Sequence, residues 1–356
     1  MNLRPISPLR APARLPRPLL AGIAATAVAA VVGVAAADTY TATFASPTLD
    51  RWNYPFNPTP GTRITASTFG NEPGAPEFDN RDGQFIVGFD TGAQVPAGLG
   101  ASRYEVVSCV VEVTVANDFV IPYDPSVDPY TVFLAASNPE RTEDEDPGQP
   151  IEIYGVGFRN GFSRANWVET SPFTVAGQNL LNPSVRNAYA LGWRDGAWVD
   201  VSNSVRGRWT PEPFAVGTID GLKPGDLVPI GTAIRFSLDV SRPEVQAYLR
   251  EAVDAGRLRL SVTSLTLVAQ QSGDFPVFYC RENPIVTATG VGAATLSMTV
   301  ATSTCVAADL DCSGSVGAQD LAILLGAWGG GGPADLDGNG TVGASDLAVL
   351  LGAWGN

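Results

Sequence analysis

Two segments near the end of the sequence carry oxygen-bearing side chains at the spacing that calcium coordination requires. The segments 308–329 and 334–355 are near-identical copies, in which Asp309 and Asp335 hold equivalent positions. Calcium takes six to eight oxygen ligands, and a 12-residue EF-hand loop supplies them from positions 1, 3, 5, 7, 9 and 12, with glycine at position 6 for a sharp turn. Both copies fill these positions, so the sequence predicts two bound Ca²⁺ ions.

The predicted ligands correspond one to one in the two loops. Loop 309–320 offers Asp309, Asp311, Ser313, the carbonyl of Ser315, Gly317 through a water molecule, and Asp320, with Gly314 at the turn. Loop 335–346 offers Asp335, Asp337, Asn339, the carbonyl of Thr341, Gly343 through a water molecule, and Asp346, with Gly340 at the turn. Because Ser313 stands where Asp or Asn is usual, we expect the first site to be the weaker one.

Each loop is followed by a short segment whose apolar residues have helical spacing. The residues before each loop are poor helix formers. The apolar positions are Leu321, Leu324, Leu325 and Trp328, with the copies Leu347, Leu350, Leu351 and Trp354. We expect most of them to form a core between two helices, and the remaining apolar surface to form a docking face. Neither helix is long enough to be stable alone, so calcium is expected to assemble this part of the chain.

A calcium loop followed by a single helix, repeated twice, resembles a type I dockerin, and the resemblance covers residues 305–356. It implies a module that attaches the chain to a cohesin-like or other cell-surface protein. In dockerins, loop positions 10 and 11 help to choose the cohesin. These positions hold Ala318 and Gln319, then Ala344 and Ser345, and they depart from the Ser-Thr pair of cellulosomal dockerins. A second hypothesis is that the repeats only stabilise the end of the chain.

Residues 38–303 have the pattern of a mainly β domain, an antiparallel β-sandwich or jelly roll with one short helix. The helix is expected after Ser241, which together with Glu244 spells a capping box, and it should end at Gly256. A change of alternation at Thr263 and Ser264 predicts a β-bulge. The predicted strands cover 84–89, 104–115, 130–135, 151–158, 234–240, 257–268 and 295–300.

Segments 85–115 and 239–265 resemble the beginning and the end of DNRLRE-type secreted domains. In those domains a strand leads through a Pro-Ala-Gly turn into a long apolar strand, and a helix-then-strand unit comes later. The resemblance implies a jelly roll of carbohydrate-binding or cell-surface type that has no catalysis of its own.

The four cysteines form an even number, which is typical of paired disulfides in an oxidising compartment. Cys109 alternates with Val107 and Val111 on one face of its strand and should point into the core. Of the three connectivities, we favour Cys109 with Cys280 and Cys305 with Cys312. The chain has no histidine, which excludes histidine metal sites and histidine-activated Ser or Cys nucleophiles.

The first 37 residues have the sequence pattern of a signal peptide, with four arginines and no acidic residue before the apolar segment 19–37. Cleavage is expected before Asp38, although a retained membrane anchor is the competing interpretation. The predicted organisation is a signal peptide at 1–37, a β domain at 38–303 and a dockerin-like domain at 304–356. The mature chain should be secreted or held at the cell surface, without a membrane span.

The acidic composition argues against nucleic acid as a partner. The formal net charge is −14, and it becomes −18 once the four arginines of segment 1–37 are removed. Binding phosphates needs a concentrated basic face. The densest acidic segment, 140–149, is interpreted as a solvated loop or an additional cation site, in preference to a catalytic pair.

Aromatic residues suggest two surfaces for a polysaccharide. The segment 192–201 reads as a hairpin with an Asp195-Gly196 turn, which places Trp193 and Trp198 opposite each other on one face. Such a pair could stack on a sugar ring or could equally be a buried cross-strand pair. Trp52, Tyr54 and Phe56 form the second candidate, for which packing is the preferred interpretation.

The sequence therefore predicts a secreted calcium-binding protein in which a dockerin-like module attaches a non-catalytic, carbohydrate-binding β-sandwich to its partner. The alternative is an extracellular carbohydrate-active enzyme, a glycoside hydrolase of polysaccharide breakdown, that carries the same module. Such an enzyme needs only two carboxylates, and no acidic pair is singled out by its spacing.

Overall fold

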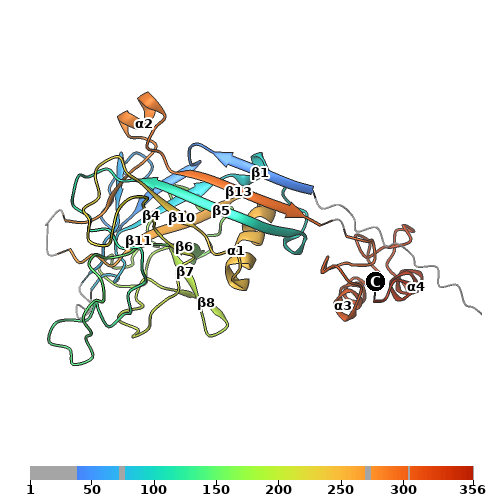
Figure 1. Cartoon of the computed structure of the whole chain (residues 1–356). Coiled ribbons are helices and arrows are strands. Elements are labelled where there is room, and N and C mark those ends of the chain that lie inside the picture. Colours follow the sequence, from blue (N-terminus) through green and yellow to red (C-terminus); the bar gives the residue numbers. More distant parts are fainter. Residues whose placement is uncertain (1–37, 72–76, 269–273, 304, 356) are drawn as a thin grey trace, which may run out of the picture. The chain divides into compact units, whose positions relative to one another are not determined.

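The chain is mainly β, with antiparallel sheets, in a computed structural model that describes residues 38–71, 77–268, 274–303 and 305–355. The predicted signal peptide, residues 1–37, lies outside these ranges. Among the described residues, no helix has the length and apolar character needed to cross a membrane. Figure 1 shows the long strands β1, β13, β5 and β10 running side by side.

The secondary structure follows the chain in three stretches. The first half contains β1 (Asp38–Phe44), β2 (Leu49–Asn53), β3 (Thr65–Ser67), β4 (Gln84–Phe89), the 3-10 turns η1 (Thr91–Ala93) and η2 (Ala101–Arg103), β5 (Tyr104–Thr114) and β6 (Ile151–Phe158). The second contains β7 (Ala188–Arg194), β8 (Ala197–Asp200), β9 (Ala215–Val216), β10 (Ala233–Ser237), α1 (Pro243–Asp254), β11 (Leu258–Ser264), β12 (Val277–Tyr279), α2 (Pro284–Thr289) and β13 (Thr295–Thr302). The last contains α3 (Ala318–Gly326) and α4 (Ala344–Gly352).

The strands form two large sheets and one small one. The first sheet has the order β1-β13-β5-β10, and the second has the order β2-β4-β11-β6-β7-β8, with β9 also paired to β6. β12 and β3 make a separate pair. One large core takes side chains from both large sheets, including Val111 and Val300 from the first and Phe85 and Leu260 from the second. This shared core is consistent with the predicted β-sandwich.

Helix α1 buries the predicted face, whose residues Val245, Tyr248, Leu249 and Ala252 all belong to the large core. Its end is also as expected, because Gly256 follows with a φ of +66°, a conformation that glycine adopts at little cost. The predicted capping box is wrong. Arg242 is the N-cap residue, Ser241 donates its hydroxyl hydrogen bond to Asp239, and Glu244 pairs with Arg242.

Two predictions on strands are also wrong. Residues 130–135 form consecutive turns, with local backbone hydrogen bonds such as that from the Val132 N–H to the Pro129 carbonyl. The bulge predicted in β11 is absent from that strand, which ends at Ser264. A register shift lies instead between β13 and β5, where Thr299 pairs with Ser108 and Val300 pairs with Val106. Val107 is skipped there and is exposed, so it does not share the core face of Cys109.

The cysteine pairing is half correct. Cys305 and Cys312 form a disulfide, whereas Cys109 and Cys280 are free thiols that are both buried. Cys109 lies six residues before Val115, and Val115 pairs with Phe278, two residues before Cys280. The bridge is antiparallel, so Cys280 lies opposite Val113, four residues from Cys109 along the strand. Four residues of strand span about 13 Å, whereas the Cα atoms of a disulfide lie about 5.5 Å apart. Both thiols point into the core, as predicted for Cys109, but from places that are too distant to be joined.

Candidate calcium sites

The structure gathers the predicted acidic ligands of the first loop around one point. Carboxylate oxygens of Asp309, Asp311 and Asp320 lie within 4.8 Å of one another. Backbone N–H groups hold them in place: Gly314 and Ser313 donate to Asp309, and Asp320 accepts from Asp311 and Gly317 at 3.0 and 2.7 Å. The hydroxyl of Ser313 lies 3.1 Å from the carbonyl of Ser315, so two further predicted ligands are adjacent.

The second loop repeats this arrangement. Oxygens of Asp335, Asp337 and Asp346 lie within 4.8 Å of one another. Asp346 accepts hydrogen bonds from the N–H groups of Asp337 and Gly343 at 3.0 and 2.7 Å, the same distances as in the first loop. The amide oxygen of Asn339 accepts a hydrogen bond from the N–H of Thr341. The six predicted carboxylate ligands thus form two matching groups.

The turn of each loop depends on residues with left-handed backbone conformation. Gly314 and Gly340, at position 6, have φ values of +90° and +92°. Position 4 is also left-handed, with Gly338 in the second loop and Cys312 in the first. Residues with a Cβ rarely adopt this conformation, and the second loop uses glycine at this position. The first loop has Cys312 there, and the disulfide to Cys305 holds this residue in place.

The hydrogen bonds keep the position-12 carboxylates ionised. For Asp346, donation from the N–H groups of Asp337 and Gly343 lowers the pKa below its ordinary value. For Asp320, burial acts to raise the pKa, but donation from the N–H groups of Asp311 and Gly317 outweighs it and the pKa is lowered. Burial raises the pKa of Asp309. Each loop therefore presents converging negative charge that a hard, divalent cation can neutralise.

A small core joins the two repeats. It consists of three equivalent pairs: Ala308 and Ala334, Val316 and Val342, Leu324 and Leu350. The backbone contacts are reciprocal, because the N–H of Gly329 donates to the carbonyl of Val342 and the N–H of Gly355 donates to the carbonyl of Val316. The repeats thus pack with approximate twofold symmetry.

The predicted core role holds for only part of the apolar helix residues. Leu324 and Leu350 are fully buried, and Leu321 and Leu347 pack partly against them. The others lie on the surface, with about half of each residue exposed: Leu325, Trp328, Leu351 and Trp354. They appear in equivalent positions of both helices. Ala318, Gln319, Ala344 and Ser345 are exposed at the beginnings of α3 and α4.

The Trp193 and Trp198 hairpin forms as predicted. The two residues pair across β7 and β8, and the turn residues Asp195 and Gly196 have φ values of +51° and +83°. The rings meet edge to face at 5.0 Å and 76°, so they do not share one flat surface. Trp198 also packs against Phe214 and, with Tyr189 and Tyr248, lines a surface hollow of about 410 Å³. This hollow is the candidate surface for stacking on a sugar ring.

The second aromatic candidate is mostly packed. Trp52 stacks on Tyr54 at 4.6 Å, and Tyr54 meets Phe69 and Phe56 edge to face. Trp52 and Tyr54 are half-buried, as the preferred interpretation expects, whereas Phe56 is 49% exposed.

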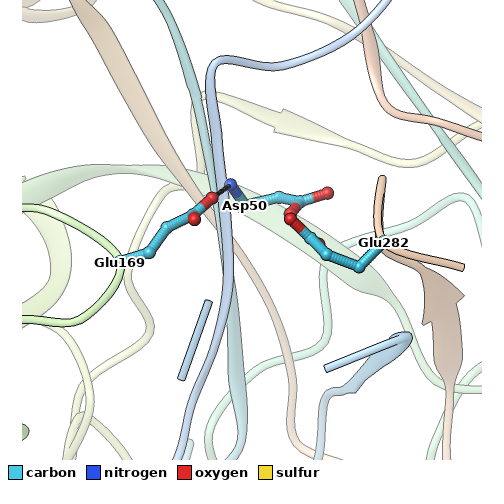
Figure 2. A group of neighbouring side chains, drawn as sticks. All are labelled: Asp50, Glu169 and Glu282. Carbon is cyan, nitrogen blue, oxygen red and sulfur yellow. Dashed lines mark hydrogen bonds between the residues drawn. The ribbon is translucent and has the colours of Figure 1, made fainter. Parts of the chain in front are cut away.

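A carboxylate group that the sequence does not reveal lies at β2 (Figure 2). Asp50 sits between Glu169 and Glu282, and oxygens of the three lie within 4.8 Å of one another. Glu169 accepts a hydrogen bond from the N–H of Asp50 at 2.7 Å. Arg281 supplies positive charge to all three, with ion pairs of 2.6 Å to Glu169, 2.7 Å to Glu282 and 3.9 Å to Asp50. The three acids come from segments more than a hundred residues apart, so no local spacing signals them.

Burial dominates the chemistry of Asp50, whose side chain has no exposed surface. Burial raises its pKa to about 8, Glu282 raises it as well, and the hydrogen bond from the Arg281 N–H opposes this. The unfolded chain has the ordinary value of 3.8. Neutral Asp50 therefore stabilises the fold fully below pH 4, and this contribution is lost as the pH rises through about 8.

We expect Asp50→Asn, which is neutral at every pH, to resist this loss. Between pH 5 and pH 9, with calcium present, its free energy of unfolding should gain up to about 4 kcal/mol relative to the unsubstituted chain, because about three pH units separate pH 5 from the raised pKa and each unit corresponds to about 1.4 kcal/mol. Urea unfolding at both pH values measures this difference. Glu145→Gln, at an exposed position, is the control and should follow the unsubstituted chain. Parallel curves for Asp50→Asn would contradict the prediction.

Comparisons with known proteins add no family assignment: neither the protein-family models, nor the curated proteins, nor the solved structures contain a match to this chain. The candidate sites are therefore interpreted from their own geometry.

Proposed function

We propose that this chain is a secreted calcium-binding protein in which residues 304–356 form a dockerin-like module that attaches the β region to a cohesin-like or other cell-surface protein. The observation that carries the proposal is the duplication of one group of three converging carboxylates. Two loops with the same acids, the same backbone hydrogen bonds and the same glycine turn stand side by side with two matching helices. Two oxygen-only sites of this size suit Ca²⁺.

The exposed apolar residues support docking over a purely structural role for the repeats. Leu325 and Trp328 on α3, with Leu351 and Trp354 on α4, remain about half exposed although the module has its own core. Exposed apolar residues that gather around aromatic anchors are typical of protein-binding surfaces. Because each helix carries the same set, the module offers a partner two equivalent faces.

The glycoside hydrolase alternative gains no support from the Asp50 carboxylate group. Asp50 has no exposed surface, and Arg281 binds all three acids, so a substrate could not reach the central carboxylate. We therefore keep a non-catalytic β region in the proposal. Polysaccharide remains its predicted ligand, and the aromatic hollow beside Trp198 is the place that favours it.

The proposal is tested by calcium-dependent capture from a cell-surface protein fraction, with the mature chain as bait. We expect a cohesin-like surface protein to be retained in calcium and released by chelation. Its affinity, measured with the purified protein, should fall at least about tenfold in the double variant Leu325→Ser, Leu351→Ser, because each removes an apolar anchor. Val291→Ser is the matched control, since Val291 is an exposed apolar residue of the β region. Equal affinity with and without calcium, or no effect of the double variant, would contradict docking.

A further inference from the structure

A second group of carboxylates in the β region lies where the long connection between β5 and β6 closes on itself. Oxygens of Asp124, Asp128 and Asp146 lie within 4.8 Å of one another. The connection covers residues 115–150 and contains no helix or extended strand. The first two acids come from its beginning and the third from its end. Asp146 belongs to the acidic segment 140–149.

Local packing brings the two ends of the connection together. Gly148 lies directly on the Tyr123 and Asp124 backbone: a Cβ added there would be 2.7 Å from the Tyr123 carbonyl oxygen and from the Asp124 Cβ. Its φ of +125° also requires glycine. The hydroxyl of Ser126 donates to Asp124 at 2.7 Å and lies 3.3 Å from an oxygen of Asp146. The three acids are therefore positioned by the fold and do not meet by chance at a flexible surface.

Buried oxygens in this group have no partner in the part of the chain that the structure describes. Asp124 and Asp128 are only 2 and 7% exposed, yet the Oδ2 atom of each accepts no hydrogen bond. Gln149 lines a small cavity together with Asp124, and its buried Oε1 atom also accepts no hydrogen bond from the described residues. An unsatisfied buried oxygen costs about 1–3 kcal/mol or more, and a buried charge costs more still.

No positive side chain relieves the charge. Among the described residues, none of the three acids forms an ion pair with lysine or arginine, whereas the Asp50 group has Arg281. Burial, together with Asp124 and the neighbouring acids, raises the pKa of Asp128 to about 7. The negative charge of the Asp50 group is thus balanced by an arginine, whereas the described residues supply no positive side chain to the Asp124 group.

We propose that Asp124, Asp128 and Asp146 bind a third Ca²⁺ ion, which fastens the two ends of the 115–150 connection. The donors are all oxygens, which hard cations prefer. Calcium–oxygen bonds of about 2.4 Å allow ligand oxygens up to about 4.8 Å apart, whereas magnesium, with bonds of about 2.1 Å, needs a tighter set. Asp146 is partly exposed and leaves a side on which water completes the coordination.

The spacing Asp124, Ser126, Asp128 resembles the first three ligand positions of an EF-hand loop, but here the remaining acid comes from 18 residues further along the chain. A connection of this length without regular structure is uncommon in a compact domain, and a cation that links its ends explains how it stays folded. This site is independent of the two C-terminal loops.

The test uses the mature full chain in which Asp320→Asn and Asp346→Asn have removed a ligand from each C-terminal loop. Native mass spectrometry after equilibration with about 1 mM free Ca²⁺, the range in which extracellular modules bind, counts the remaining ions. We expect one. Adding Asp146→Asn should abolish it, as should Asp128→Asn. The matched control is Glu145→Gln, an exposed neighbour that loses the same charge and should keep the ion.

Circular dichroism of each variant checks that the sheets are retained, and Asp146→Asn is the decisive change because this partly exposed residue tolerates an isosteric substitution best. The proposal is overturned if the background binds no ion, if Asp146→Asn keeps the ion, or if the site takes Mg²⁺ and refuses Ca²⁺. Each of these results leaves the C-terminal loops, and therefore the docking proposal, unaffected.

Discussion

Chelation of calcium is expected to unfold α3 and α4 and to leave the β sheets folded. Each helix has nine residues, below the length of about 12–15 at which an isolated helix becomes even marginally stable in water. The core between them contains only six buried residues, two of them alanines in equivalent positions. Without the ion, three converging carboxylates in each loop repel one another. Neither local propensity nor packing is sufficient to offset these costs.

The mature full chain, followed by circular dichroism during chelation and readdition of calcium, measures this. Within the part of the chain that the structure describes, about half of the α-helical residues belong to α3 and α4, so roughly half of their helical signal should disappear and return. The variant Asp320→Asn, Asp346→Asn should show the reduced signal even in calcium. Asp195→Asn is the control, because Asp195 is an exposed acid in a turn that also accommodates asparagine. A helical signal that is indifferent to chelation would show that the module folds without metal.

The features that were predictable from the sequence depend on short-range patterns. Each C-terminal loop holds its predicted calcium ligands within 12 residues, so the convergence of Asp309, Asp311 and Asp320 is encoded locally. The alternation that defines a strand is equally local, and β4, β6 and β13 lie where it predicts. The hairpin at Trp193 and Trp198 was predictable because Asp-Gly prefers the left-handed backbone that a two-residue turn requires.

The failures depend on contacts between distant segments. Val107 fits the alternation of its strand, but the pairing with β13 skips it and turns it outward. Residues 130–135 are apolar enough for a strand, but Phe133 and Leu134 bury themselves against Val205 and Leu265 without a neighbouring strand to pair with. The even cysteine count suggested two disulfides, and only the pair seven residues apart is formed. The Asp50 and Asp124 groups assemble from separate segments, so spacing could reveal them only in part.

The largest stability loss from a single substitution in the β region is expected at Arg81. Its guanidinium is completely buried and donates to Glu152 from two nitrogens at 3.0 and 2.7 Å, as well as to Ser204 and the Val201 carbonyl. Arg81→Met would leave the Glu152 carboxylate, itself 3% exposed, without a countercharge. Breaking a buried ion pair in this way costs about 3–5 kcal/mol, because the remaining charge is still desolvated.

Urea unfolding in calcium measures this loss, and a double variant identifies its cause. Arg81→Met combined with Glu152→Leu removes both charges, so it should be less destabilised than Arg81→Met alone. The matched control is Arg235→Met, because Arg235 pairs with Glu112 at 2.9 Å but both side chains are more than a third exposed. That substitution should cost less than about 1 kcal/mol, since water screens the pair and solvates the carboxylate left behind. If Arg81→Met costs no more than Arg235→Met, the buried pair does not stabilise this fold.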